Sequence, residues 1–298
     1  MRPSAIGRAL LALGDQWALL ILQRAFLLHT RRFADWRDEL GISESVLAGR
    51  LRELVAGGLL EAVPYRDHGR TRQEYRLTER ALELWPFLVS VWSWERQWVK
   101  RTHPLPELLH HECGDRVDVE LGCAECGKAP VTARDTDTER GAEAVSHTAT
   151  PRLHRRTVRA GTERDAVSYC PETLEILGDR WSTVLLAAAF LRVRRFAEFQ
   201  SELGVAPSIL SDRLRRFTEL GVLEQVEVPG ARHEYRLSAK GLAFFPVFAF
   251  LVDWAQRWHP EDPAEVVITH RACGGRLLPF LRCAACHAPV SRTGIAFT

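Results

Sequence analysis

Six of the seven cysteines fall into two clusters of identical spacing, and a histidine opens each cluster. The two patterns are His110-x2-Cys113-x9-Cys123-x2-Cys126 and His270-x2-Cys273-x9-Cys283-x2-Cys286. Three thiolates and one imidazole complete a tetrahedral zinc shell, and ligand pairs at this short spacing are typical of zinc-binding turns. We therefore expect two structural zinc sites, one in each cluster. His111 and His287 are competing imidazoles, but neither keeps the register of the other cluster.

Closed zinc shells of this kind leave no position for a catalytic water. The sequence also lacks an HExxH motif, a glycine-rich phosphate loop and a nucleophile elbow. We therefore expect no enzyme. The odd number of cysteines, together with the CxxC pairs, argues against a disulfide framework.

The elements around the clusters occur twice. LGDQW at 13–17 returns as LGDRW at 177–181, and RRFA at 31–34 returns as RRFA at 194–197. RLR at 50–52 returns at 213–215, and EYRL at 74–77 returns at 234–237. The repeats keep their order up to the cysteine clusters, so the chain is a duplication.

The composition fits two folded copies joined by a linker. A chain of 298 residues with 46% hydrophobic and 26% charged residues is ordinary for a globular protein of about two domains. Residues 134–165 are rich in Thr, Arg, Glu and Ala and poor in large apolar side chains, which predicts a flexible linker between domains at 1–133 and 166–298. The arginines of this linker fit a solvated segment better than phosphate contacts; they are Arg152, Arg155, Arg156 and Arg159.

The net charge of +2 and the pI near 8.2 decide nothing about nucleic acid. No signal peptide is evident, and the longest apolar runs fall short of the roughly 20 residues that span a bilayer. These features predict a cytoplasmic protein without a membrane partner.

Copy two has the clearer structural signals. Helices are predicted at 171–178, 181–191, 196–203 and 207–220, followed by alternating strands at 222–228 and 231–237. Ile209, Leu210, Leu214 and Phe217 should form the buried face of the fourth helix. A last helix should run from Ser238 to Trp258 and kink at Pro246, and the last helix of copy one should kink at Pro86. The expected class is mainly α with small β-hairpin wings (α+β), in two winged helix-turn-helix domains, each with a small zinc-ribbon-like module.

This ordered set of motifs resembles the HxlR family of bacterial regulators, over residues 13–98 and 177–258. The resemblance implies a cytoplasmic, sequence-specific DNA-binding transcriptional regulator that acts as a repressor. Because such regulators act as homodimers on two-fold symmetric operators, it also implies that the two copies pair within one chain. Further self-association of the chain stays open, as does a small-molecule or redox effector. The cysteine-containing tails are not part of the family pattern.

The fold implies which side chains meet double-stranded DNA, because the recognition helix enters the major groove and its early residues reach base edges. The candidates on the two recognition helices are Ser43, Ser45, Arg52, Ser208, Ser211 and Arg215. Arg50 and Arg213 either hold phosphates or brace the helix. The remaining candidates precede the motif or lie on the wings: Arg31, Arg32, Arg194, Arg195, Arg70, Arg72 and Arg232, the last beside His233.

The two recognition helices differ. Copy one has Ala48 and Gly49 where copy two has Ser211 and Asp212, and glycine weakens a helix interior by about 1 kcal/mol relative to alanine. We therefore expect unequal half-sites, or a dominant reading helix in copy two.

Two further features leave alternatives open. Cys170 stands where some family members carry a redox-sensing cysteine, although an ordinary buried thiol fits equally well. The tryptophans of the last helices (Trp92, Trp94, Trp98, Trp254 and Trp258) either line an effector pocket or, as we favour, form core and a seam between copies. A competing function is a zinc-ribbon adaptor that binds proteins and has little specific affinity for DNA.

Overall fold

The computed structural model describes residues 15–101, 104–141, 170–178, 180–229, 231–260 and 266–297, together with residues 5, 6, 9 and 13. The linker arginines named above lie outside the described residues. No described helix is long and apolar enough to cross a membrane.

From residue 15 onward, the described part of copy one folds as three helices, a β-hairpin and two further helices. These elements are α2 (Gln16–Leu27), α3 (Phe33–Leu40), α4 (Glu44–Ala56), β1 (Leu60–Asp67), β2 (Arg70–Leu77), α5 (Glu79–Leu82) and α6 (Trp85–Trp98). Copy two repeats this order and begins with α7: α7 (Pro171–Leu177), α8 (Arg180–Phe190), α9 (Phe196–Leu203), α10 (Pro207–Glu219), β6 (Leu223–Val228), β7 (Ala231–Leu237), α11 (Ala239–Leu242) and α12 (Phe245–Trp258). Residues 5, 6, 9 and 13, which precede α2 in copy one, are helical as well. This is the winged helix-turn-helix predicted for each copy, with α4 and α10 as the recognition helices.

The turns before and after the recognition helices follow from glycine. Gly41 and Gly204 end α3 and α9 in the left-handed region, at φ of 57° and 58°. Gly58 and Gly221 do the same after α4 and α10, at φ of 68° and 69°. A residue without Cβ adopts this conformation without strain, so the same two sharp turns occur in both copies.

The last helix of each copy is broken rather than kinked, which corrects the sequence prediction. Ser238 caps the one-turn helix α11 by accepting a hydrogen bond from the Gly241 N–H, and Thr78 caps α5 in the same way. The chain then restarts as α12 and α6, with Pro246 and Pro86 in the first turn. Proline is tolerated there because the first N–H groups of a helix have no partner inside it.

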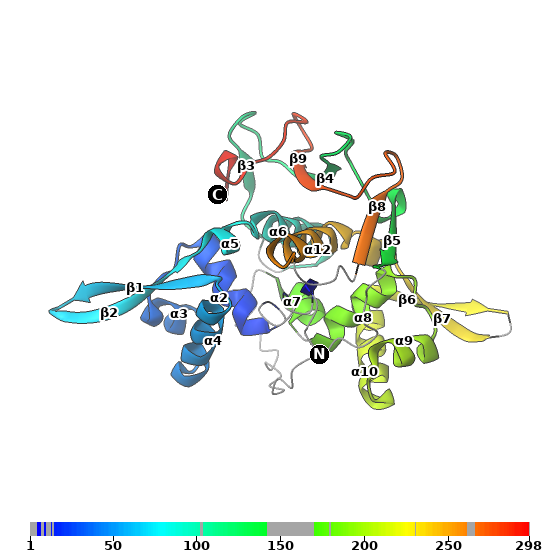
Figure 1. The fold of residues 1–298 in the computed structure, drawn as a ribbon, viewed down its shortest axis with the longest axis horizontal. Coiled ribbons are helices and arrows are strands. Elements are labelled where there is room, and N and C mark those ends of the chain that lie inside the picture. The colour runs from blue at the N-terminus through cyan, green and yellow to red at the C-terminus, as the bar shows by residue number, and fades with distance from the viewer. Residues whose placement is uncertain are drawn as a thin grey trace.

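The tails that follow α6 and α12 are interlocked, as the upper part of Figure 1 shows. Their strands are β3 (Leu108–His110), β4 (Val119–Cys123), β5 (Thr136–Arg140), β8 (Val266–His270), β9 (Pro279–Cys283) and β10 (Ile295–Phe297), with 3-10 turns η1 (Ala133–Asp135) and η2 (Arg292–Gly294). Every sheet here pairs one strand of each copy, antiparallel: β3 with β10, β4 with β9, and β5 with β8. A separate zinc-ribbon-like module in each copy was therefore the wrong expectation, because each tail strand has its hydrogen-bond partner in the other copy.

The predicted linker starts too early. Residues 133–140 form η1 and β5, and β5 pairs with β8 along its whole length. Its threonines and charges gave no core pattern because most of the strand is exposed or half-buried. The predicted linker from residue 142 onward lies outside the described residues.

A seam between α6 and α12 joins the two copies near the centre of the molecule (Figure 1). Trp94 Nε1 donates to the Lys240 carbonyl at 3.0 Å, and Trp254 Nε1 donates to the Arg80 carbonyl at 2.9 Å. The Lys240 ammonium also lies over the Trp94 ring, 5.4 Å from its centroid, and the Arg80 guanidinium lies over the Trp254 ring, 5.1 Å from its centroid. The two contacts are equivalent in the repeat, so the seam has an approximate two-fold symmetry. The favoured role for Trp94 and Trp254, packing between the copies, is confirmed.

Candidate nucleic-acid interface and metal centres

The recognition helices α4 and α10 lie on the same side of the molecule, opposite the interlocked tails, and the wings β1–β2 and β6–β7 extend outward at its two ends (Figure 1). Leu47, Leu51 and Leu54 fix α4 to its copy, and Leu210, Leu214 and Phe217 fix α10. Ser43 and Ser45 of copy one and Ser208 and Ser211 of copy two are exposed, as a base-reading role requires. Ile209 was expected in the core, but its side chain is 38% exposed near the start of α10.

Asp15 connects the LGDxW motif to the recognition helix of copy one. Its Oδ1 accepts from the backbone N–H groups of Trp17 and Ala18, at 3.1 and 3.2 Å, and so caps α2. Its Oδ2 accepts from Arg50 Nη2 at 3.0 Å, while Arg50 Nη1 donates to Glu53 at 2.6 Å. Only 17% of the Arg50 side chain is exposed. Of the two roles left open by the sequence, the geometry favours bracing over phosphate binding for Arg50; Arg213 is half-buried and 3.4 Å from Asp212.

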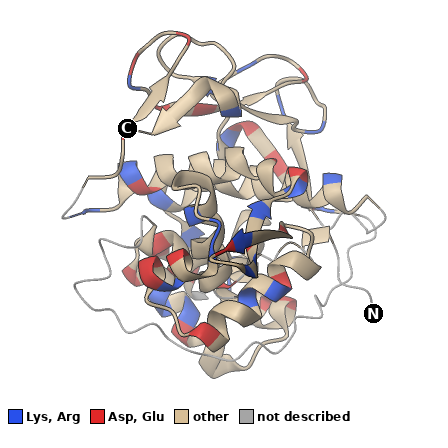
Figure 2. Cartoon of the chain, turned by 90° about the vertical axis from the view of Figure 1, so that its left-hand side faces the viewer, with Lys and Arg blue, Asp and Glu red and all other residues tan. Residues whose placement is uncertain are grey.

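The exposed arginines of the two recognition helices have different surroundings. Arg52 donates to the Ala48 carbonyl, one turn earlier in α4, at 3.3 Å. Arg215 instead pairs with Asp212 at 2.8 Å and with Glu219 at 2.5 Å. Asp212, which stands where copy one has Gly49, therefore places a negative charge beside Arg215, the candidate base-reading arginine of copy two. Acidic and basic residues are interspersed along the helices of the copy-one side as well (Figure 2).

In the part of the chain that the structure describes, the paired arginines that precede each helix-turn-helix also have carboxylate partners in copy two but not in copy one. Arg31 is exposed without a carboxylate partner among the described residues, and the Arg32 guanidinium lies over the Tyr65 ring at 5.0 Å. In copy two, Arg194 and Arg195 both face Glu234, at 3.9 and 3.6 Å. The backbone N–H groups of both also donate to Glu198, which holds the pKa of that carboxyl below its usual range.

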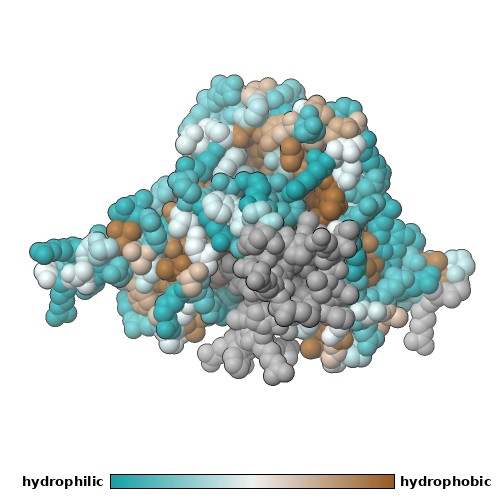
Figure 3. All heavy atoms as spheres, viewed as in Figure 1, coloured by the Kyte–Doolittle hydropathy of each residue, from teal (hydrophilic) through white to brown (hydrophobic). Residues whose placement is uncertain are grey.

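Copy one has the more basic wing. His68 and Gly69 form its tip at positive φ, the signature of a two-residue hairpin turn, and Asp67 pairs with Arg70 in register. Arg70 and Arg72 are exposed there, with Arg72 3.1 Å from Asp67. Exposed Arg66, which the sequence analysis missed, has no counterpart in the shorter hairpin of copy two. Hydrophilic side chains cover most of this wing (Figure 3); the side chain of Arg232, the candidate on the other wing, lies outside the described residues.

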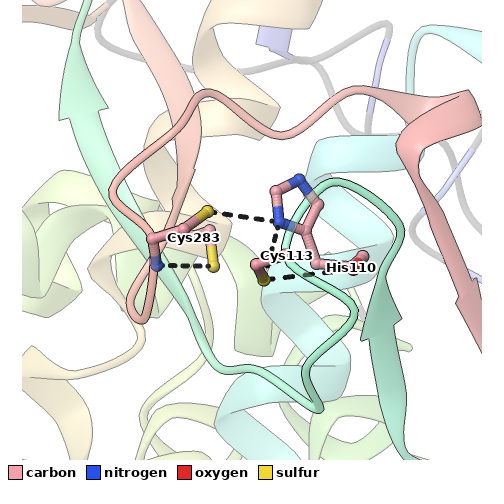
Figure 4. Close-up of side chains that lie close together, drawn as sticks. His110, Cys113 and Cys283 are labelled. Carbon is pink, nitrogen blue, oxygen red and sulfur yellow. Dashed lines mark hydrogen bonds between the residues drawn. The ribbon is translucent and has the colours of Figure 1, made fainter.

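The candidate metal ligands form two clusters, but not the two that the sequence suggested. One cluster contains His110, Cys113, Cys283 and Cys286, and the other contains Cys123, Cys126, His270 and Cys273. Each cluster thus combines the His-x2-Cys pair of one copy with the CxxC pair of the other. Figure 4 shows the loop that carries His110 and Cys113 facing the loop that carries Cys283. The assignment of one site to each copy is wrong because β4 pairs with β9, which carries each CxxC turn across to the opposite copy.

The geometry of both clusters suits zinc. His110 Nδ1 lies 3.4 Å from Cys113 Sγ and 3.5 Å from Cys286 Sγ. His270 Nδ1 lies 3.4 Å from Cys126 Sγ and 3.5 Å from Cys273 Sγ. A tetrahedral ion with Zn–S of about 2.3 Å and Zn–N of about 2.0–2.1 Å places N and S about 3.5 Å apart. All four ligand atoms of each cluster lie within 4.8 Å of one another, as one ion requires.

Cys170 lies apart from both clusters, in front of α7. It is 7% exposed, and Gln23 Nε2 donates to its sulfur at 3.0 Å. Burial raises the pKa of the Cys170 thiol, so the reactive thiolate is disfavoured. These surroundings are those of an inert buried thiol, and the redox role stays a prediction that an unchanged oxidant response of Cys170→Ser would contradict.

Comparison with known proteins gives the same division of the chain. The uncharacterized HTH-type transcriptional regulator Rv3095 of Mycobacterium tuberculosis (strain ATCC 25618 / H37Rv) is 41% identical over 138 residues, which are 46% of this chain and 85% of that protein. The uncharacterized HTH-type transcriptional regulator YvaP of Bacillus subtilis (strain 168) is 30% identical over 95 residues, 30% of this chain and 88% of that protein. The crystal structure of PA1607 is 31% identical, covers 46% of this chain and 99% of that chain, and has a TM-score of 0.38.

Rv3095 and YvaP thus align over most of their own length with less than half of this chain. The family model described as HxlR-like helix-turn-helix matches twice, at residues 12–103 and 176–263, which together are more than half of the chain. Both matches contain a recognition helix and its wing. The chain belongs to the HxlR-like helix-turn-helix family and is a DNA-binding transcriptional regulator with two copies of the family's domain in one polypeptide.

Proposed function

We propose that one chain reads an operator with both helix-turn-helix copies at once, as a covalent counterpart of a dimer. The observation that carries this proposal is the seam between α6 and α12, whose paired tryptophan contacts relate the copies by an approximate two-fold axis. Because α4 and α10 lie on either side of that axis and on the same face of the molecule (Figure 1), we infer that one molecule places a recognition helix in each of two neighbouring major grooves.

The test is a titration of a labelled duplex from upstream of the protein's own gene, against a scrambled duplex, over a salt series. Specific affinity should exceed non-specific affinity by at least about 10³-fold and should fall steeply with salt, because arginines release counterions from phosphates. The mass of the complex should correspond to one chain per two half-sites. Equal binding to both duplexes would favour the protein-binding adaptor, and a complex of two chains would favour further self-association over pairing within the chain.

We further propose that the copies contribute unequally. In copy one, Arg31, Arg52, Arg66 and Arg70 have no carboxylate partner among the described residues, whereas Arg194, Arg195 and Arg215 of copy two face carboxylates. Copy one therefore supplies more of the phosphate contacts, while the base-reading dominance expected of copy two stays a prediction. Repression is the direction of regulation we infer from the family, and a promoter fusion with and without the gene would test it.

We also propose that both crossed clusters hold structural zinc. The ligand set and the nitrogen–sulfur distances support this, and a full shell of four protein ligands supports a structural role. Purified protein should contain two zinc ions per chain by elemental analysis. Chelation should lower the melting temperature, since binding energy at such a site is folding energy; an unchanged melting temperature after complete zinc removal would contradict the structural role.

A further inference from the structure

A cavity of about 640 Å³ lies in copy one, bounded by α2, α6, the wing strand β2 and two segments that follow the linker. Copy one supplies Phe26, Trp85, Leu88 and Trp92 to its walls, and the later half of the chain supplies α7 and β10. The volume falls within the range of small-molecule sites, which are mostly apolar with a few placed polar groups.

One polar atom on these walls has no hydrogen-bond partner among the described residues. It is Gln23 Oε1, on a residue that is 8% exposed. Thr173, 2% exposed, adds a hydroxyl to the same wall, and this hydroxyl interacts with Glu95. The opposite end of the Gln23 amide is committed to the Cys170 sulfur, and the Thr173 backbone N–H donates to Glu95 Oε1 at 2.7 Å. Both side chains are thus held in place, and the Gln23 amide oxygen remains available. Buried polar atoms of this kind are rare unless something pairs with them.

The corresponding half of the duplication lacks these groups. Ala187 takes the place of Gln23, and Ala9 takes the place of Thr173. In copy two, Phe190 stacks on Phe248 at 4.7 Å, where copy one has Phe26 and Leu88. The polar walls therefore exist on one side of the pseudo-symmetric molecule.

The exposed residues that line the cavity define its mouth and give it a positive charge. These residues are His29, Arg31, Arg76, Arg292 and Glu61. Arg76 pairs with Glu74 at 2.5 Å, whereas Arg31 and Arg292 have no carboxylate partner among the described residues. These two arginines against Glu61 favour an anionic group at the mouth, while the aromatic walls favour a flat apolar body. Gln23 Oε1 accepts a hydrogen bond and so requires a donor on the buried part of the ligand.

We propose that this cavity binds one anionic aromatic molecule per chain, with a hydroxyl or N–H donor on Gln23 and its acidic group among the arginines of the mouth. The ligand contacts both halves of the chain and lies beside Arg31, a candidate phosphate contact. Its action as an effector of DNA binding rests on the proposed function, but its binding does not.

The probe for the test is 8-anilino-1-naphthalenesulfonate, which has an aromatic body, one N–H donor and a sulfonate. Fluorescence titration of the intact, zinc-loaded chain should give saturable binding of one probe per chain. N-phenyl-1-naphthylamine keeps the aromatic body and the N–H but lacks the sulfonate, so it should bind about tenfold more weakly. Equal affinity for the two probes would overturn the role of the mouth.

Variants borrowed from the other half of the duplication test the position of the site. Gln23→Ala removes the acceptor and should weaken the probe about fivefold to tenfold, whereas Leu88→Phe fills the cavity and should weaken it more than tenfold. Ala187→Gln places the same amide in copy two and is the matched control, with unchanged affinity expected. Unsaturable binding, or the same affinity in Gln23→Ala, Leu88→Phe and the control, would overturn the proposal whether or not the protein binds its operator.

If operator binding is observed, the probe should change operator affinity in the wild-type chain and not in Leu88→Phe. A probe that saturates one site but leaves operator affinity unchanged would overturn the effector role and retain the site. A chain that binds the probe at one site but no operator would overturn the proposed function and retain the site as well.

Discussion

At the scale of single residues, the family motif is explained by one carboxylate with two tasks. Asp15 caps α2 and at the same time anchors Arg50 of the recognition helix, so the LGDxW stretch and the RLR stretch depend on each other. Sequence spacing shows only that the motifs recur together. Contact between them, across 35 residues, requires the packing of α2 against α4.

Replacing Asp15 with alanine should lower the free energy of unfolding by about 2 kcal/mol, because the helix loses its cap and Arg50, largely buried, loses a charged partner. Arg50→Ala should cost a similar amount. Because the two changes remove one shared contact, the double variant should be less destabilised than the sum of the singles, measured by urea unfolding in a double-mutant cycle. Additive losses would mean that the ion pair contributes nothing and that the cap alone matters.

The carboxylate beside Arg215 leads to a second prediction at this scale. Asp212→Asn removes the negative charge and should raise operator affinity about threefold to tenfold at low salt, because Arg215 is released and repulsion of the phosphates falls. In copy one, Gly49→Asp should lower affinity relative to Gly49→Asn, a pair that differs only in charge. The measurement is fluorescence anisotropy at two salt concentrations; the same affinity for Gly49→Asp and Gly49→Asn would exclude an electrostatic origin.

At the scale of elements, the sequence predicted most of the helix-turn-helix because its signals are local. The glycines that end α3, α4, α9 and α10, and the alternating wing strands, act within a few residues of where they stand. Ile209 was misplaced for a related reason: helical periodicity allows it a core position, but the α10 core needs only Leu210, Leu214 and Phe217. Exposure of one apolar residue depends on what packs opposite it, which periodicity does not specify.

The wing of copy one leads to a prediction about an element rather than a base contact. Arg70→Gln should weaken binding to specific and scrambled duplexes by a similar factor and reduce the slope of log affinity against log salt by about 1, as the loss of one phosphate contact does. Arg271→Gln, an exposed arginine of the tail that pairs with Asp137, is the control and should leave the slope unchanged. A loss of affinity for the operator alone would indicate base reading by the wing instead.

At the scale of the whole molecule, the sequence identified all eight candidate ligands but not their partners. Because the two clusters have identical spacing, a pairing within copies and a pairing between copies satisfy the ligand pattern equally well. The choice is made by β4 and β9, whose register places Leu121 opposite Leu281. Cross-strand pairing of this kind joins residues far apart in the chain, and no local pattern in the sequence records it.

Two double variants distinguish ligand pairing between the copies from ligand pairing within each copy, because the two pairings predict opposite zinc contents for them. Cys113 and Cys283 belong to the same cluster of the structure, so Cys113→Ser/Cys283→Ser should retain one zinc per chain. Cys113 and Cys123 belong to different clusters, so Cys113→Ser/Cys123→Ser should lose both ions. Sites contained within each copy would reverse the two results, because the first double variant would then damage both sites and the second only one. The two variants are matched in number and type of substitution, and elemental analysis of both decides between the pairings. The variant that keeps one ion should also have the higher melting temperature, because one metal bridge between the copies survives.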